Sequence, residues 1–236
     1  MAQVLTKIKN KYKRSPDLGL AQTLKQKTKL VSWIASNCKY SNGAKTRMNI
    51  VNKMVESGIK MDLRGSCFPK NLPAPPRNDK DLLEFLGRSK FYLAFENSYH
   101  CKDYITEKVY RNAFLSGSVP VVWGSKKEDY EAVMPKRSFI FLEDYASNFT
   151  KLRNYLDFLD RNDTAYGEYL TWRLLDPSQL HGHRLSTGRC SLCRRLQGGS
   201  YQEKIKLKAR NSSWIHKWYY ESEDAECWNK TKHKYS

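Results

Sequence analysis

The sequence predicts an α/β protein built on a doubly wound parallel sheet. Short apolar runs of the length of buried strands recur along the chain, and amphipathic segments that favour helices alternate with them. Strands that alternate with helices pair in parallel, which places helices on both faces of the sheet. With 236 residues, of which 40% are hydrophobic, the chain is long enough to bury a substantial core.

The expected elements follow one another in a regular order. The stretch before residue 29 is basic and has weak helical periodicity, so we expect a linker or the remnant of a preceding domain there. Beyond it, we expect strands at residues 30–35, 61–63, 91–95, 119–123 and 139–142, and helices at residues 46–56, 81–86, 106–116 and 152–159. The first of these helices has an apolar face and ends at Gly58, and a proline-rich loop covers residues 66–79.

Residues 91–124 form one strand–loop–helix–strand unit that carries most of the functional information. Thr106 is expected to be the N-cap of its helix, and Gly117 to end that helix. In parallel sheets, ligands bind beyond the carboxyl ends of the strands. Five polar residues of this unit are expected at that edge: Glu96, Asn97, Tyr104, Glu107 and Lys108.

Glu107 and Lys108 indicate the kind of ligand. A helix N-terminus presents unpaired N–H groups and a partial positive charge, which suits a phosphate. Lys108 has the wrong charge for the first helical turn, and a bound anion would explain it. The carboxylate of Glu107 can accept two hydrogen bonds from a vicinal diol such as ribose. These features indicate a nucleotide or nucleotide-sugar, while the alternative, two solvated surface charges, explains the pattern alone equally well.

The amino-acid sequence of this unit resembles the signature of the α1,3/α1,4-fucosyltransferases, whose donor is GDP-fucose. FENS, DYITEK, RNA and SGSVPVVWG occur in the family's order and spacing. Two further segments, KLVSWIASNC near residue 30 and RCSLCRRL near residue 190, extend the resemblance to roughly residues 27–197. That span is similar to the C-terminal, donor-binding half of the family's members.

The resemblance implies a Rossmann-like domain that faces a second one across a cleft, the GT-B arrangement. It also implies a donor site in which Lys108 contacts the diphosphate and Glu107 the ribose hydroxyls. Asn97 and Tyr104 would line the same site. No catalytic residue is assignable, because the family's general base is a carboxylate of the N-terminal domain.

An arginine on the helix after the first strand would hold the diphosphate as well. Arg47 fits best, because RMNIVNKM matches the family's helix pattern from that arginine onward, and Lys45 is the competing choice. These basic side chains take the place of a metal, so no cofactor is expected. The implied reaction is inverting transfer of L-fucose from GDP-fucose to an N-acetylglucosamine-containing glycan of glycoproteins or glycolipids. The alternative is a non-catalytic donor- or glycan-binding fragment or pseudoenzyme.

The resemblance divides the chain into three parts. Residues 1–28 precede the domain, residues 29–197 form the GDP-fucose-binding domain, and residues 198–236 are a basic, aromatic tail. Family members are anchored in the Golgi membrane and face its lumen. Residues 1–30 hold no apolar run long enough for a signal peptide or a span. We therefore expect a fragment or an incomplete gene product, with membrane attachment only through an anchor outside this chain.

The cysteines and glycosylation sequons favour an oxidising, luminal compartment. Cys38 and Cys67 each follow a strand, so they share one edge of the sheet and are close enough in principle to form a disulfide. Pairing among Cys190, Cys193 and Cys227 stays open. Possible N-glycosylation sites are Asn148, Asn162, Asn211 and Asn229.

Several other interpretations have weaker support. The net charge of +18 would attract nucleic acid, but no recognition motif accompanies it, and GxGxxG and P-loop sequences are absent. The possible zinc ligands are His181, His183, Cys190 and Cys193, and their spacing is unusual for zinc. Asp79 and Asp81 have the DxD form of a metal site, but they lie at a helix start, where capping and the dipole favour Asp. The aromatic residues near Trp214 fit a helix packed on the domain.

Overall fold

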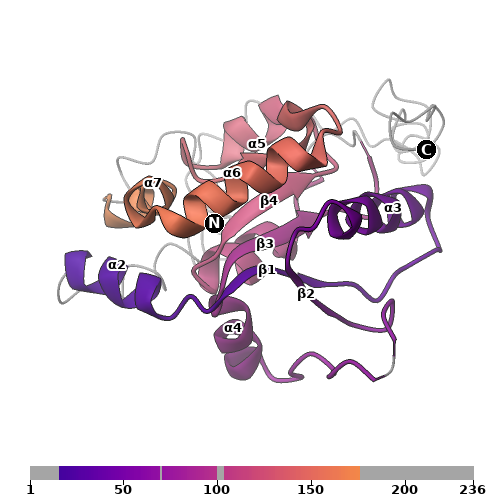
Figure 1. The fold of residues 1–236 in the computed structure, drawn as a ribbon, viewed down its shortest axis with the longest axis horizontal. Coiled ribbons are helices and arrows are strands. Elements are labelled where there is room, and N and C mark those ends of the chain that lie inside the picture. The colour runs from indigo at the N-terminus through magenta and orange to yellow at the C-terminus, as the bar shows by residue number, and fades with distance from the viewer. Residues whose placement is uncertain (1–15, 70, 100–103, 176–236) are drawn as a thin grey trace, which may run out of the picture.

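The computed structural model describes residues 16–69, 71–99 and 104–175. The five strands of the sheet are β1 (Lys29–Ile34), β2 (Met61–Arg64), β3 (Ser89–Phe95), β4 (Val119–Trp123) and β5 (Ile140–Phe141). They pair in the order β2-β1-β3-β4-β5, and every pairing is parallel (Figure 1). The predicted parallel sheet is confirmed. The order reverses between β1 and β3, which is where doubly wound sheets bind ligands.

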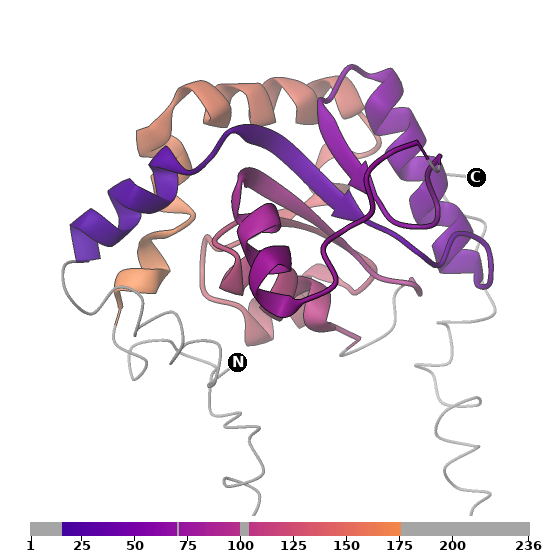
Figure 2. The same ribbon diagram turned by 90° about the horizontal axis from the view of Figure 1, so that it is seen from below.

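Helices cover both faces of this sheet. They are α2 (Pro16–Lys25), α3 (Asn42–Glu56), α4 (Asp79–Gly87), the π-helix η1 (Lys108–Leu115), α5 (Lys127–Val133), α6 (Phe149–Arg161), α7 (Asp163–Glu168), and the 3₁₀ helices η2 (Leu142–Tyr145) and η3 (Thr171–Leu174). Helices α3, α6 and α7 pack on one face, and α4, η1 and α5 pack on the other (Figure 2).

Strand β3 shows why the sheet is buried on both sides. Phe91, Leu93 and Phe95 point into the core under α3 and α6, whereas Tyr92 and Ala94 point into the core under α4 and η1. All five side chains are at most 1% exposed. Alternate residues of a strand face opposite sides, so a continuous apolar run is needed to fill two cores at once.

Two helix starts differ from the prediction because of local capping. Helix α3 begins at Asn42, four residues earlier than expected, because the Ser41 hydroxyl accepts a hydrogen bond from the backbone N–H of Ala44 at 3.1 Å. The prediction of Thr106 as an N-cap is wrong. Glu107 occupies that position, and the Thr106 hydroxyl bonds to the carboxylate of Glu96 instead.

The segment before β1 is attached to the domain. Helix α2 packs against the core, and Lys27, just after it, donates hydrogen bonds from Nζ to three main-chain oxygens. Those oxygens belong to Gly87, Ser89 and Gly117, at 2.9, 2.9 and 2.7 Å. Lys27 thereby satisfies carbonyls at the ends of α4 and η1 and at the start of β3. The domain boundary at residue 28 stays a prediction.

Cys38 and Cys67 form the disulfide that their positions suggested. It links the loop after β1 to the loop after β2. Gly65 permits this approach because its φ is +109° and a Cβ there would overlap the main chain of Ala35. The bridge thus fixes the β1–α3 loop against its neighbour.

Two of the four sequons lie in the described part of the chain. Asn148 and Asn162 are the N-caps of α6 and α7, where their side chains accept hydrogen bonds from Lys151 and Ala165. The remaining predictions concern residues outside the described ranges: Asn211, Asn229, Cys190, Cys193, Cys227, His181, His183 and the tail 198–236. None of the described helices is long and apolar enough to cross a membrane.

Candidate functional site

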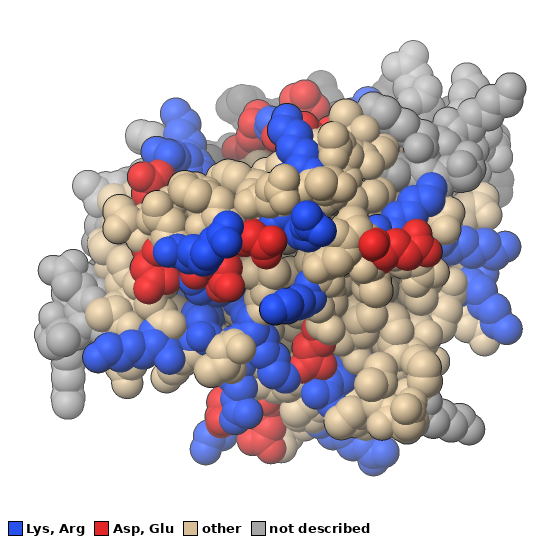
Figure 3. All heavy atoms as spheres, viewed as in Figure 1, with Lys and Arg blue, Asp and Glu red and all other residues tan. Residues whose placement is uncertain are grey.

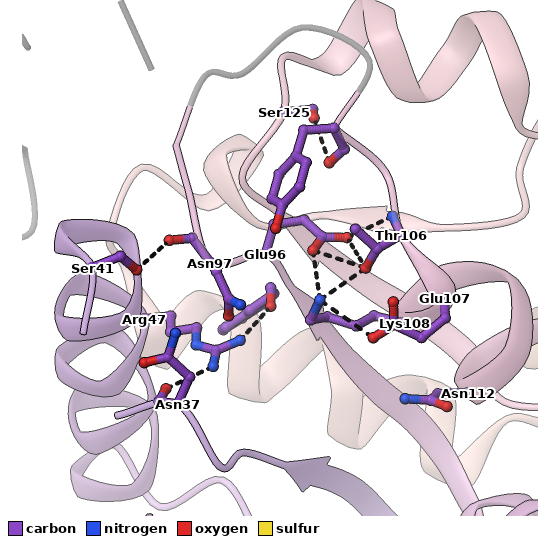
Figure 4. A network of polar contacts seen from close by, with 12 residues as sticks. Asn37, Ser41, Arg47, Glu96, Asn97, Thr106, Glu107, Lys108, Asn112 and Ser125 are labelled. Atoms are coloured by element: carbon purple, nitrogen blue, oxygen red, sulfur yellow. Dashed lines mark hydrogen bonds and ion pairs between the residues drawn. The ribbon is translucent and has the colours of Figure 1, made fainter. Parts of the chain in front are cut away.

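Two helices begin where β1 and β3 end, and the predicted site residues gather between them (Figure 4). The N-terminus of α3 lies against Asn97, whose main-chain oxygen accepts a hydrogen bond from Ser41 Oγ at 2.8 Å. Gly43 makes this contact possible, since a Cβ there would overlap the oxygen of Asn97. Neither α3 nor η1 has an acidic residue in its first turn. Their N–H groups and dipoles favour an anion between them.

Arg47 on α3 lies under this edge and is 2% exposed. Its guanidinium donates to the main-chain oxygen of Phe95 at 3.0 Å and to that of Asn37 at 2.8 Å, and it lies 5.5 Å from the ring centre of Trp33. Burial lowers the pKa of Arg47, and the nearby charge of Glu96 opposes this shift. An arginine stays protonated even so. Arg47 therefore joins the ends of β1 and β3 and brings a positive charge to the site.

Lys45, the competing choice, is exposed on the same helix. Arg47 has a second property that bears on a ligand. Its Nε is buried and has no hydrogen-bond partner among the described residues. A buried donor of this kind is costly unless a ligand or water satisfies it.

Glu96, Thr106 and Lys108 form a compact network at the end of β3 (Figure 4). The carboxylate of Glu96 is fully buried and accepts hydrogen bonds from Thr106 N, Thr106 Oγ1 and Lys108 Nζ at 2.9, 2.9 and 2.7 Å. Lys108 Nζ also donates to Thr106 Oγ1 at 2.8 Å. Gly124, with φ of +129°, makes room for the network, because a Cβ there would lie 2.7 Å from Glu96 Cβ.

The other three predicted residues surround this network. The side-chain oxygen of Asn97 is buried and unpartnered among the described residues, so it is an acceptor that a ligand could use. The side chain of Glu107 is 59% exposed, with its carboxylate 3.6 Å from Lys108 Nζ. Tyr104 is half-buried, and burial, reinforced by the charge of Glu96, raises the pKa of its phenol. The phenol therefore stays protonated at neutral pH and can donate a hydrogen bond.

A separate pocket lies away from these residues. It has a volume of about 1010 Å³ and is lined by residues of β1, β2 and α6, and by none of the predicted donor-binding residues. The face drawn in Figure 3 carries more Lys and Arg than Asp and Glu side chains, in keeping with the basic composition. The candidate site is instead an open edge of the domain between two helix starts.

Acidic side chains in the described ranges do not gather into a metal site. No group of three or more His, Cys, Asp and Glu residues there is placed to hold a metal ion. Asp79 and Asp81 lie in the first turn of α4, whose N-cap is Asn78. Asp79 forms an ion pair with Arg111, so helix and ion-pair stability explain this sequence without a metal.

Residues 24–214 match the family described as glycosyltransferase family 10 (fucosyltransferase), C-terminal part. The chain belongs to this family. The match covers the sheet, both helix starts and all five predicted donor-binding residues. The resemblance inferred from the sequence motifs is thereby confirmed.

Similar proteins of the fucosyltransferase family carry names that state an activity. The chain is 42% identical over 155 residues to alpha-(1,3)-fucosyltransferase 4 of Bos taurus, covering 66% of this chain and 36% of that protein. It is 45% identical over 147 residues to 4-galactosyl-N-acetylglucosaminide 3-alpha-L-fucosyltransferase 9 of Homo sapiens, covering 62% of this chain and 38% of that protein. The chain thus spans less than half the length of these relatives.

Two crystal structures of an alpha1,3-fucosyltransferase share the fold. One superposes with a TM-score of 0.52 at 25% identity, over 72% of this chain and 45% of the other. The second, a crystal structure with GDP, superposes with a TM-score of 0.51 at 25% identity, over 70% of this chain and 45% of the other. The five-stranded sheet is therefore the fold of one half of a fucosyltransferase of GT-B type.

The structure brings Asn97, Tyr104, Glu107 and Lys108 together at one edge, and adds residues that the sequence did not assign to the site. Glu96 was expected at this edge without a role, and it is the residue to which Lys108 bonds. One feature of the sequence could have indicated this role of Glu96: it is a glutamate directly after a strand that is buried on both faces. A charged residue in that position requires a partner.

Proposed function

We propose that this chain is the donor-binding part of an inverting, metal-independent fucosyltransferase that uses GDP-fucose. The observation that carries the proposal is the position of Lys108 and the start of α3 at the switch point of a sheet whose sequence belongs to the fucosyltransferase family. Structural similarity to a crystal structure of an alpha1,3-fucosyltransferase with GDP supports the choice of nucleotide. We assign the diphosphate to Lys108 and Arg47, and the ribose to Glu107.

In this proposal the same residues also act in bond cleavage. Transfer breaks the bond between fucose and the β-phosphate oxygen, so negative charge grows on the departing GDP. Fixed cations and helix N-termini at that position stabilise the charge without having to reorganise. Inversion also requires a base that deprotonates the acceptor hydroxyl. Glu96 is buried and bonded and Glu107 is assigned to ribose, and we assign the base, as the family resemblance implies, to a carboxylate of the N-terminal domain.

The acceptor and the compartment are further parts of the proposal. The relatives' names support an N-acetylglucosamine-containing glycan as acceptor and an α1,3 linkage. The Cys38–Cys67 disulfide is consistent with the Golgi lumen, an oxidising compartment. We propose no nucleic-acid partner.

Two measurements test the proposal. Calorimetric titration of the chain with GDP and with ATP should show binding that is specific for GDP, and absence of GDP binding would overturn the donor assignment. A donor-turnover assay with a lactosamine acceptor should be run on the 236-residue polypeptide and on one extended upstream. GDP binding with no turnover in either would favour the alternative, a non-catalytic donor- or glycan-binding protein. We expect the shorter polypeptide to bind GDP and to transfer little fucose, because the family resemblance places the base and the acceptor pocket in the N-terminal domain.

A further inference from the structure

Glu96 is a buried carboxylate that the proposed reaction does not use directly. Glu96 directly follows β3, and its side chain is fully buried. Its backbone N–H donates a hydrogen bond to Trp123 O at 3.0 Å. A carboxylate in such a place is retained only with hydrogen bonds and a cation. Among the described residues, Lys108 is the cation that pairs with it.

Lys108, in turn, is held by Glu96. A lysine at the first position of a helix ordinarily samples many rotamers in water. Here two of the three ammonium hydrogens are directed to Glu96 Oε2 and Thr106 Oγ1, at 2.7 and 2.8 Å, and the side chain is 14% exposed. The same ammonium lies 3.6 Å from Glu107 Oε1, which is too long for a hydrogen bond, so its third hydrogen can be donated to a phosphate oxygen. Thr106 bonds to both partners and closes the triangle.

The charges at the site make the position of Lys108 more important than its charge alone. Arg47 and Lys108 supply two positive charges, while Glu96 and Glu107 supply two negative ones, so the formal charges of these four residues cancel. These four side chains therefore add little net attraction for a diphosphate to that of the helix N-termini, and their contribution depends on where the cations point. Removing one carboxylate would raise the net charge but release the lysine.

We propose that Glu96 is a positioning residue, which fixes the ammonium of Lys108 toward the phosphate of the donor through a network that includes Thr106. This inference rests on the proposed function of the site. It predicts that loss of the Glu96 charge weakens GDP binding, whereas net charge alone predicts that this loss strengthens it. Glu96→Gln should weaken GDP binding by about tenfold although it removes a negative charge beside the diphosphate. Tighter binding by this variant would overturn the proposal.

Matched variants separate positioning from charge and from folding. Glu84→Gln removes an equal charge from an exposed residue of α4 and should leave GDP affinity unchanged. Thr106→Val keeps every charge and the side-chain shape but removes the shared hydroxyl, and it should weaken GDP binding by about threefold. This second variant decides the question if Glu96→Gln does not fold. Normal GDP affinity in Thr106→Val, or equal loss in Glu84→Gln, would contradict the proposal.

A double-mutant cycle shows whether Glu96 acts through the lysine. In a Lys108→Ala background, Glu96→Gln should have little further effect on GDP affinity. Equal losses in both backgrounds would overturn the proposal. NMR of the lysine side-chain ammonium groups supplies a readout that needs no nucleotide. The wild-type chain should show a slowly exchanging Lys108 signal that disappears in Glu96→Gln. If the wild-type chain fails to bind GDP, the proposed function is contradicted. The Lys108 ammonium signal, measured without nucleotide, still tests whether Glu96 positions Lys108.

Discussion

Arg47 on α3 donates a hydrogen bond to the main-chain oxygen of Phe95, the last residue of β3, at a distance of 3.0 Å. A second bond to Asn37 O, at 2.8 Å, attaches the same guanidinium to the loop after β1. Two neighbouring strands therefore end at one side chain. The planar fork of arginine directs separate nitrogens at the two acceptors, whereas a lysine at this position would have to reach both from one nitrogen.

Arg47→Lys should for this reason lower the free energy of unfolding by about 1–3 kcal/mol, because a buried carbonyl loses its donor while the charge is kept. Urea unfolding measures the change. The exposed residue two positions earlier provides the control, since Lys45→Met should leave stability nearly unchanged. Equal stability of the two variants would show that Arg47 does not join the strand ends.

Lys108→Ala should weaken GDP binding by about 1.5–3 kcal/mol, the value of a charge-assisted contact to phosphate. Calorimetric titration gives the change in affinity, and circular dichroism checks that the variant is folded. Lys151→Ala, on the exposed side of α6, is a control of equal charge change. GDP affinity that is unchanged in the Lys108 variant would remove this residue from the site.

Glu107→Gln should distinguish recognition of the sugar from recognition of the phosphates. The assigned role of Glu107 is to accept hydrogen bonds from the ribose diol, so the variant should lose about tenfold in GDP affinity. Affinity for inorganic diphosphate should not fall. The test is a pair of titrations, one with each ligand. A similar loss for both ligands would mean that Glu107 supports the loop and does not contact the ribose.

Donor binding should survive chelation. Because cations and helix N-termini occupy the site, titrations of GDP-fucose in EDTA and in Mn²⁺ should give the same affinity. Asp79→Ala should not alter either value, since Asp79 pairs with Arg111. A strict requirement for Mn²⁺ or Mg²⁺ that disappears in Asp79→Ala would establish a metal site and refute the metal-independent reaction.

Lys27→Met should lower the free energy of unfolding by about 1–3 kcal/mol, because three main-chain carbonyls lose a shared charged donor. Thermal or urea unfolding provides the measurement. Lys25→Met, in the last turn of α2 and exposed, is the matched control. If both variants unfold alike, Lys27 does not attach this segment to the sheet.

Local sequence patterns were enough to predict the sheet and the edge at which the polar residues after β3 gather. The run from Phe91 to Phe95 predicted a strand buried on both faces, because its length and composition suit a short strand whose two faces are both covered. Carboxyl ends of parallel strands share an edge, so the polar residues after β3 had to lie together. The identity and spacing of the motif residues, and not their periodicity, distinguished a fucosyltransferase from other nucleotide-binding proteins.

The partners of these side chains were decided only by the tertiary structure. Sequence spacing made Thr106 a suitable helix cap, but its hydroxyl bonds to Glu96, which is ten residues earlier in the chain and adjacent only in the folded protein. Lys27 likewise reaches carbonyls 60 to 90 residues away. Buried polar groups take whichever partner the packed core brings within hydrogen-bond distance, and periodicity carries no information about contacts of that range.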